Sequence, residues 1–387
     1  MASTAATSWS HSRSSTFERC LRRYWFNYFG RNKTVWKDLA AAGDAAGGGD
    51  AADFPLLQSR LRLLGSLSSL PMTAGTVVHS TLESGIRAFQ EDSEARPTSD
   101  VLMPMAKEHY ATLLRSAISR AGVRSPRSRI PLLAEIYYPP HEIAWPMRSL
   151  HWGTVRKCVD NFGRAAASGD GIVGEMLADD SRIVSLERRE SLRIADPDAD
   201  EASHFHLDFA MDVAYERANG DLVIVDWKSG KAYEDHKDQL ALYGLLAHEM
   251  YGREPESIVV VGAYLKQNEF TELRCSKDLL DDARARVIAS ARTMVEQDKQ
   301  RMRVEAYPHT DRRGDCKSCA FRQICTAVDF DPDATVADME RALTEETNRV
   351  DALEAADLAL LVQRIPMHAD RVLLDATRQP VSPFMPA

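Results

Sequence analysis

A strand-turn-strand pattern in the middle of the chain constrains the fold more than any other feature. Residues 206–216 are rich in strand-forming residues, residues 222–225 read Leu-Val-Ile-Val, and the Asn219-Gly220 dipeptide between them is typical of tight hairpin turns. Two such runs around one turn pair with each other. The pattern therefore predicts an antiparallel hairpin with an apolar, mostly β-branched returning strand.

The returning strand ends abruptly in Asp226-Trp227-Lys228. Because side chains alternate along a strand, Asp226 and Lys228 lie on the same face, and Asp212 lies on the strand that pairs with theirs. Two carboxylates across such a pair form a hard oxygen site suited to Mg2+ or Mn2+. A metal there would stabilise charge on a phosphoryl group and activate a bound water, while Lys228 orients that water. The alternative is that these charges simply mark the point where the strand leaves for solvent.

A glutamine and a tyrosine follow on the next predicted helix. Gln239 and Tyr243 are four residues apart and so share one helical face. An Asp, a hairpin, a strand ending in Asp-Trp-Lys-Ser-Gly and a helix with Gln-x-x-x-Tyr together resemble the PD-(D/E)XK nucleases of the RecB type, which include the CRISPR-associated adaptation exonucleases. The resemblance implies that Gln239 and Tyr243 contact the substrate or the surroundings of the lysine.

The resemblance also implies a fold and an activity. The fold would be α/β, with a restriction-endonuclease-like core, a central mixed sheet flanked by helices, and a helical insertion. The activity would be that of a metal-dependent deoxyribonuclease, an exonuclease acting on single-stranded or unwound DNA in DNA repair, recombination or anti-phage defence. The rival hypothesis is a non-catalytic DNA-binding or scaffolding subunit that retains the nuclease fold.

Roles for individual residues follow from the same resemblance. Asp212 and Asp226, with the carbonyl of Trp227, would hold Mg2+ or Mn2+, and Lys228 would position the attacking water. Relatives commonly have Gly-x-Ile-Asp where this chain has Phe-Ala-Met-Asp. Asp208, four residues before Asp212 on the same strand face, is therefore the alternative first ligand.

Two further candidates lie upstream. Gly75 to Glu83 is typical of the start of a helix, and its Gly-x-x-x-His spacing resembles the family pattern in which the histidine, here His79, ligates a second metal. A lone histidine on a helix is otherwise a structural residue. Residues 182–187 predict a strand that ends in an acid. Glu187 resembles the catalytic glutamate of the first core strand in the family, and the alternative is a solvated strand end.

Four of the six cysteines form a metal-ligand pattern. Cys316, Cys319 and Cys325 are spaced C-x2-C-x5-C, and Cys20 lies near the N-terminus. Thiols in a reducing compartment are better interpreted as metal ligands than as disulfides. Four thiolates suit either zinc or an iron-sulfur cluster. The resemblance to the iron-sulfur branch of these nucleases implies a [4Fe-4S] cluster that joins the N- and C-terminal parts as a clasp, with zinc as the alternative occupant.

The formal net charge of -9 does not exclude a nucleic-acid partner, because a binding groove needs only a local basic stripe. The first 37 residues hold many basic residues, a single acid, and interleaved aromatic residues. We expect Arg19, Arg22 and Arg23 from this segment to contact DNA, together with Lys231 behind the Asp-Trp-Lys motif. The alternative is that the aromatic residues are the buried face of a helix.

The chain divides into six expected segments. They are a basic and aromatic helix (1–37), an Ala/Gly-rich flexible link (38–53), a helical lobe with the His79 helix (54–180), the nuclease core (181–310), the cysteine motif (311–330) and an amphipathic helical tail (331–387). The tail can dock on its own domain or bind a partner such as a helicase or another subunit. No apolar run is long enough to cross a bilayer, which predicts a cytoplasmic protein without a membrane partner.

Overall fold

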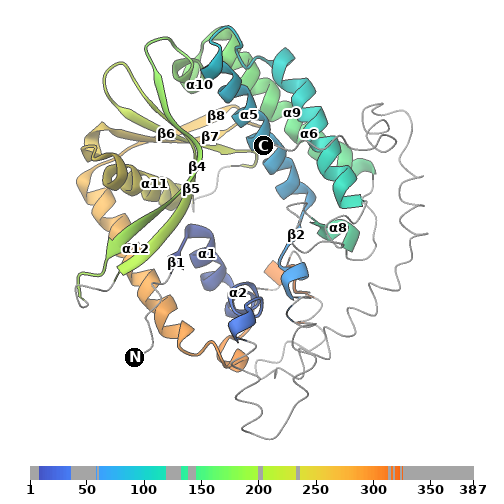
Figure 1. Cartoon of the computed structure of the whole chain (residues 1–387), viewed down its shortest axis with the longest axis vertical. Helices are drawn as coiled ribbons and strands as arrows, with labels where there is room; N and C mark the ends of the chain where they lie inside the picture. The colour runs from blue at the N-terminus through green and yellow to red at the C-terminus, as the bar shows by residue number, and fades with distance from the viewer. Residues whose placement is uncertain are drawn as a thin grey trace, which may run out of the picture.

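The computed structural model is a mixed α/β fold in which helices lie on both sides of a central mixed sheet (Figure 1). The structure describes residues 8–35, 58, 61–118, 132–137, 145–198, 204–231, 236–312, 315–316, 319–322 and 325. The expected link over 38–53 and the expected tail over 331–387 lie outside these ranges. None of the described helices is long and apolar enough to span a membrane.

The central sheet has the strand order β1-β5-β6-β7-β8, and β4 pairs with β5. Its strands are β1 (Ser8–Trp9), β4 (Arg182–Ala195), β5 (His204–Glu216), β6 (Leu222–Lys228), β7 (Ile258–Tyr264) and β8 (Glu269–Arg274). The β1–β5 and β6–β7 pairs are parallel, and the other pairs are antiparallel. A separate parallel pair consists of β2 (Leu67–Ser68) and β3 (Leu132–Leu133). Since β4 pairs along all of β5, β1 and β6 share the other edge of β5.

The expected hairpin is formed by β5 and β6, which pair antiparallel through residues 213–216 and 222–225. Gly220 in the turn has φ 87°, a conformation that glycine adopts at little cost. β6 and β7 are neighbouring parallel strands inside the sheet, so both consist of nearly continuous apolar runs. Asp226 interrupts the run in β6 and is only 4% exposed, so the fold holds a carboxyl group in its interior.

Alternate side chains of β6 face two different hydrophobic cores. Val223, Val225 and Trp227 pack in the core that contains α5, α6, α9 and α10, whereas Leu222 and Ile224 pack in the core that contains α2, α11 and α12. The helices are α1 (His11–Arg19), α2 (Leu21–Tyr28), α5 (Leu70–Glu91), α6 (Ser99–Ile118), α8 (Ala134–Tyr137), α9 (Trp145–Ser168), α10 (Gly171–Met176), α11 (His236–Tyr251) and α12 (Lys277–Asp298), with short 3-10 turns η1 (Pro255–Ser257) and η2 (Val304–Ala306). The helices expected to form a lobe therefore share a core with the sheet.

The expected end of the first long strand is wrong. β4 does not stop at Glu187 but continues to Ala195, because residues 188–195 keep pairing with residues 204–211 of β5. Glu187 itself has no partner in the ladder, but the backbone on both sides of it does.

The expected start of the His79 helix is also wrong. α5 begins at Leu70, where Ser69 caps the helix by accepting the N–H of Met72, and Pro71 occupies the first turn. His79 therefore lies in the middle of a 22-residue helix, where its backbone is held on both sides.

The N-terminal segment forms two helices that meet at Cys20 instead of one. Trp25 is fully buried and Phe26 is 1% exposed, which confirms the alternative interpretation of the aromatic residues as a buried face. The indole Nε1 of Trp25 donates to the carbonyl of Arg301 at 2.8 Å, and the ring of Phe26 packs on Phe321 at 4.9 Å between centroids. These contacts fasten the N-terminal helices to the segment that follows α12.

Arg22 lies inside this contact and not on its surface. The side chain is 1% exposed, and its Nε donates to the carbonyl of Tyr307 at 2.7 Å. The prediction that Arg22 contacts nucleic acid is wrong, because the protein itself encloses the guanidinium group.

Candidate active site

Three acidic residues align across three neighbouring strands. Val213 of β5 lies opposite Leu186 of β4 and opposite Val225 of β6. Asp212, Glu187 and Asp226 each lie one residue from these paired positions, and none of the three has a partner in the strand pairing of β4 with β5 or of β5 with β6. The register thus places three carboxyl groups in one row, at the point where β5 and β6 stop pairing.

The side chain of Asp212 takes the place of the next backbone hydrogen bond between β5 and β6. Its Oδ2 accepts the N–H of Trp227 at 2.7 Å, just beyond the last paired residues of β5 and β6. The indole of Trp227 packs edge-on against Phe162 of α9, with 5.5 Å between ring centroids. The backbone bond and the buried ring hold the end of β6 in place against Asp212.

A histidine from α5 joins two of these carboxyl groups. His79 Nδ1 lies 3.2 Å from Asp212 Oδ1 and 3.4 Å from Glu187 Oε1. One ligand atom from each of the three residues lies within 4.8 Å of the others, which makes them a candidate metal site. Carboxylate oxygens and an imidazole suit Mg2+, Mn2+ and related divalent cations.

The protonation of His79 shows that this site favours a positive charge. Burial alone would lower the pKa of the imidazole, but the hydrogen bonds and charges of Asp212 and Glu187 outweigh burial and raise that pKa to about 10. The two carboxylates therefore stabilise a positive charge between them. A divalent cation supplies such a charge, and it would bind His79 as a neutral ring after the proton has left.

Glu187 reaches this group through an unusual backbone conformation. Its φ is 46°, in the left-handed region that non-glycine residues seldom occupy. The residue is absent from the ladder, although Leu186 and Arg188 on either side pair with β5. Such a conformation costs on the order of 1 kcal/mol and persists where the surrounding structure imposes it. Here the strands on both sides impose it.

Gly75 lets α5 approach the end of β6. A Cβ added at Gly75 would lie 3.3 Å from Ser229 Oγ, in the segment directly after the Asp-Trp-Lys motif. Gly75 is one helical turn before His79, so both residues lie on the face of α5 that meets the site. The Gly-x-x-x-His spacing thus has a steric reason in this structure.

A second network surrounds the lysine. Lys228 Nζ lies 2.6 Å from Asp226 Oδ2 and donates to Gln239 Oε1 at 3.0 Å. Gln239 Nε2 donates to the Tyr243 hydroxyl at 3.2 Å, and that hydroxyl donates to Asp226 Oδ1 at 3.3 Å. These four residues form a closed ring of contacts between β6 and α11, which holds the ammonium group in one position.

Burial dominates the protonation of this ring. It raises the pKa of Asp226 to about 6, with Lys228 lowering it and Asp212 raising it further. Burial also raises the pKa of Tyr243 well above its ordinary value, so the hydroxyl stays a neutral donor. The charges of Asp212 and His79 both act on Asp226, which links the lysine ring to the His79 group.

The remaining expected site residues lie further out. Asp208 is exposed and accepts a hydrogen bond from Ser8, so the structure brings Asp212, and not Asp208, to His79 and Glu187. Lys231 is exposed, three residues after Lys228.

One neighbour of the site was missed from the sequence. Tyr264 ends β7 opposite Lys228, and its ring stacks on His236 with 5.6 Å between centroids. The hydroxyl lies 3.0 Å from His236 Nδ1. The signal was present in the parallel pairing of β6 and β7, because parallel strands that begin together bring their last residues together.

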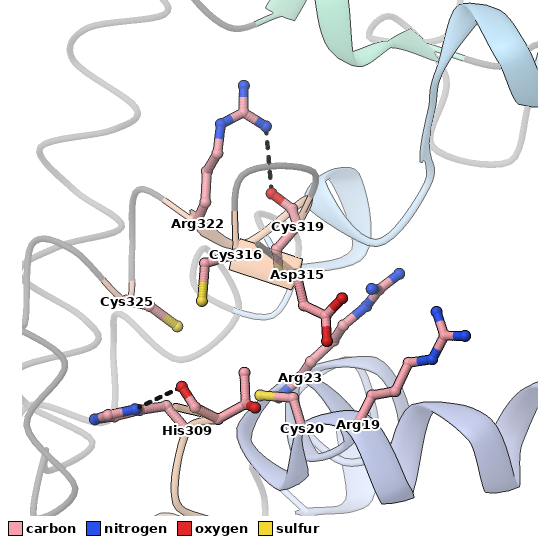
Figure 2. Close-up of a pocket in the computed structure, with 10 residues that line it drawn as sticks. Arg19, Cys20, Arg23, His309, Asp315, Cys316, Cys319, Arg322 and Cys325 are labelled. Carbon is pink, nitrogen blue, oxygen red and sulfur yellow. Dashed lines mark hydrogen bonds between the residues drawn. The ribbon is translucent and has the colours of Figure 1, made fainter. Parts of the chain in front are cut away.

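All four motif cysteines line one pocket (Figure 2). The pocket lies between the junction of α1 and α2 and the segment after α12, and its lining includes Arg19, Cys20, Arg23, His309, Thr310, Asp315, Cys316, Cys319, Arg322 and Cys325. Burial raises the pKa of Cys319 and of Cys325, and the charges of Cys20 and Cys316 raise both further. Among the described residues, no three of the sulfurs lie within 4.8 Å of one another.

A groove runs between α1, α11 and α12. Its lining includes Gln239, the partner of Lys228, and Arg19, which also lines the cysteine pocket. Arg286 and Arg312 lie in the same groove, together with the acid Asp238. The groove therefore connects the neighbourhood of the lysine with the neighbourhood of the cysteines.

Comparison with known proteins identifies one family. The model of the PD-(D/E)XK nuclease superfamily matches residues 56–326, well over half of the chain. The match contains the His79 group, the lysine ring and the C-x2-C-x5-C motif. A search of curated proteins found no match.

Proposed function

The chain belongs to the PD-(D/E)XK nuclease superfamily, and from this membership we propose that it is a divalent-metal-dependent deoxyribonuclease that hydrolyses phosphodiester bonds. The observation that carries the proposal is the row of Glu187, Asp212 and Asp226 beside Lys228. Three acidic residues this close together on neighbouring strands would destabilise a fold without a functional role for them, since like charges repel. The central mixed sheet flanked by helices is consistent with a restriction-endonuclease-like fold.

His79, Glu187 and Asp212 would hold Mg2+ or Mn2+, with Asp226 and the carbonyl of Trp227 beside them. A bound divalent ion supplies charge stabilisation at the phosphoryl group and a water of lowered pKa. The three side chains would fix the position of the divalent ion. Their positions are set by three different elements, α5, β4 and β5.

Lys228 would position the attacking water or neutralise the developing charge on the phosphate. Its ammonium group is held between Asp226 and Gln239, and Tyr243 closes the ring as a neutral donor. A group restrained from both sides loses little freedom when the substrate arrives. Gln239 and Tyr243 therefore act through the position of Lys228 in this proposal.

We assign a [4Fe-4S] cluster to Cys20, Cys316, Cys319 and Cys325, with zinc as the alternative. The convergence of all four thiols on one pocket supports a metal site. The resemblance of the four-cysteine pattern to that of the iron-sulfur branch of these nucleases favours the cluster over zinc.

The substrate in this proposal is single-stranded or unwound DNA, cleaved as by an exonuclease. The groove that joins Gln239 to Arg19 supports a single strand, because its lining includes the apolar side chains of Leu242 and Val287 and three arginines, Arg19, Arg286 and Arg312. A helicase or another subunit would deliver unwound DNA, and repair, recombination and anti-phage defence are settings that need this reaction.

The test is cleavage of end-labelled single- and double-stranded DNA with Mg2+ or Mn2+, using protein purified without oxygen. Lys228→Ala should lose activity by about 10²–10³-fold, the usual effect of removing a group that stabilises charge in the transition state. Lys277→Ala is the control, because Lys277 is exposed and paired with Asp281 on α12. Wild-type protein that binds DNA but cuts none, with its cluster present, would instead support the non-catalytic subunit.

A further inference from the structure

One face of the long β4–β5 hairpin has no helix over it among the residues that the structure describes, and its side chains are exposed. Beyond Glu187 and Asp212, side chains such as Leu192, Ile194 and Phe205 pack into the core that contains α2, α11 and α12. The alternate positions face the other way. They include the exposed residues Arg189, Ser191, Arg193, Asp208 and Ala210. This uncovered face continues the side of the sheet on which His79 meets Glu187 and Asp212.

Two arginines on this face are not used in ion pairs. Arg189 and Arg193 are four residues apart on β4, hence on one face, and none of the ion pairs between described residues involves either. Other arginines of β4 behave differently. Arg182 pairs with Glu216, and Arg188 pairs with Glu190. Among the described arginines of β4, the two without an ion pair thus lie on this exposed face.

The arginines continue directly from the acidic row. Arg189 comes two residues after Glu187 on β4, and its partner on β5 comes two residues before Asp212. Opposite Arg189 is Ala210, a small residue that leaves space above the sheet. Opposite Arg193 is His206, which is partly exposed. A strand of nucleic acid lying along this face would pass from Arg193 over Arg189 to the carboxyl groups.

We propose that Arg189 and Arg193 bind successive parts of the phosphate backbone of the DNA strand and set its register relative to Glu187 and Asp212. This inference rests on the proposed function and specifies where the substrate lies. Phosphate contacts of this kind position a strand without reading its sequence. The competing explanation is that exposed arginines on an edge strand only prevent pairing with other chains.

The experiment measures the salt dependence of binding. Full-length protein in a chelator, which prevents cleavage, is titrated against a fluorescein-labelled single-stranded oligonucleotide at several salt concentrations. Each phosphate contact contributes about 0.7 to the slope of log affinity against log salt for a single strand. The double variant Arg189→Ala/Arg193→Ala should therefore lower the magnitude of the slope by about 1.4.

A matched control separates position from net charge. The double variant Arg182→Ala/Arg188→Ala removes two charges from the same strand, but from arginines that are already paired, and should keep the wild-type slope. Arg189→Lys/Arg193→Lys should also keep it, since the charges remain. A wild-type slope in Arg189→Ala/Arg193→Ala, or an equal loss in the control, would overturn the proposal. If wild-type protein cleaves DNA but Arg189→Ala/Arg193→Ala has the wild-type slope, the proposed DNA contact on β4 is wrong and the nuclease function stands. If wild-type protein neither cleaves nor binds DNA, the proposed nuclease function is wrong as well.

Discussion

Asp212 and Asp226 lie on β5 and β6, each one residue beyond Val213 and Val225, the last pair of the hairpin, and the charge of Asp212 acts on Asp226. The two side chains have different partners. Asp212 faces His79 and a backbone N–H, whereas Asp226 faces the lysine ring. Asp212 can therefore act mainly in metal binding, whereas Asp226 can connect the metal site to Lys228.

Metal binding should follow this division. Asp212→Ala should weaken Mn2+ binding by tenfold or more, roughly the effect of disturbing a metal-ligand set. Lys228→Ala should not weaken it, because removing an ammonium group takes away a repelling charge. Isothermal titration with Mn2+ measures both. Equal weakening in the two variants would show that the effect comes from a disturbed fold and not from a lost ligand.

Glu187 should trade stability for activity. Glu187→Gly and Glu187→Gln both lose the charge that faces His79, but only glycine removes the cost of φ 46°, so Glu187→Gly should be more stable than Glu187→Gln by about 1 kcal/mol while both lose cleavage. Urea unfolding and the DNA assay measure the two effects separately.

A second left-handed residue provides the control for Glu187. Asn268, with φ 58°, lies in the turn between β7 and β8 and is not a member of the His79 group or of the lysine ring. Asn268→Gly should leave cleavage unchanged and change stability little, because asparagine tolerates this conformation better than glutamate. A loss of cleavage in Asn268→Gly would mean that backbone freedom alone, and not the missing carboxylate, explains the Glu187 result.

The hairpin and the lysine ring could be predicted from the sequence because their geometry is local. A five-residue connection fixes which residues of β5 and β6 face each other, and a spacing of four fixes Gln239 and Tyr243 on one helical face. The boundaries of α5 and β4 were not predictable in this way. Ser69 caps α5 well before the motif, and β4 continues past Glu187 because β5, a distant segment, still offers backbone partners.

Contacts between segments far apart in the sequence could not be predicted from local patterns. Cys20 and the three later cysteines meet only because Trp25 and Phe26 dock on the segment after α12, and no spacing between them encodes that contact. The burial of Arg22 has the same origin. In the sequence it is one basic residue among several, and only the carbonyl of Tyr307 distinguishes it.

The cysteine pocket gives a spectroscopic prediction. Protein purified without oxygen should be brown and absorb visible light, and Cys319→Ser should be colourless with a lower melting temperature, since the clasp is lost. Cys275→Ala should stay coloured, because Cys275 is buried beneath α11 and is not in the pocket. Colourless wild-type protein with one zinc ion per chain would contradict the cluster and support zinc.

The contact between the N-terminal helices and α12 should depend on pH through Asp298. Burial raises the pKa of Asp298 to about 6, although Arg13 and the hydrogen bond from Tyr24 lower it. The folded protein therefore binds a proton at higher pH than the unfolded chain does. The contribution of Asp298 to the free energy of unfolding is fully present below its ordinary pKa of 3.8 and is lost as the pH rises through about 6.

Asp298→Asn isolates this term because asparagine does not titrate. The free energy of unfolding of wild type minus that of Asp298→Asn should fall by about 2 kcal/mol between pH 4 and pH 7, allowing for partial solvent screening. Urea unfolding across this range measures the difference. A difference that rises with pH would mean that the ion pair with Arg13 outweighs burial.

Gly75 should be what allows α5 to lie close to the end of β6. Gly75→Ala adds a methyl group 3.3 Å from Ser229 Oγ, so either α5 or the segment after Lys228 must shift by a few tenths of an ångström. Alanine also favours a helix interior over glycine by about 1 kcal/mol. The variant should therefore melt at the wild-type temperature or higher, yet cleave more slowly, because His79 moves relative to Asp212. Ser229→Gly in the same chain removes the contact and should restore cleavage. If Gly75→Ala slows cleavage and Ser229→Gly does not restore it, the close approach of α5 to Ser229 is not what positions His79.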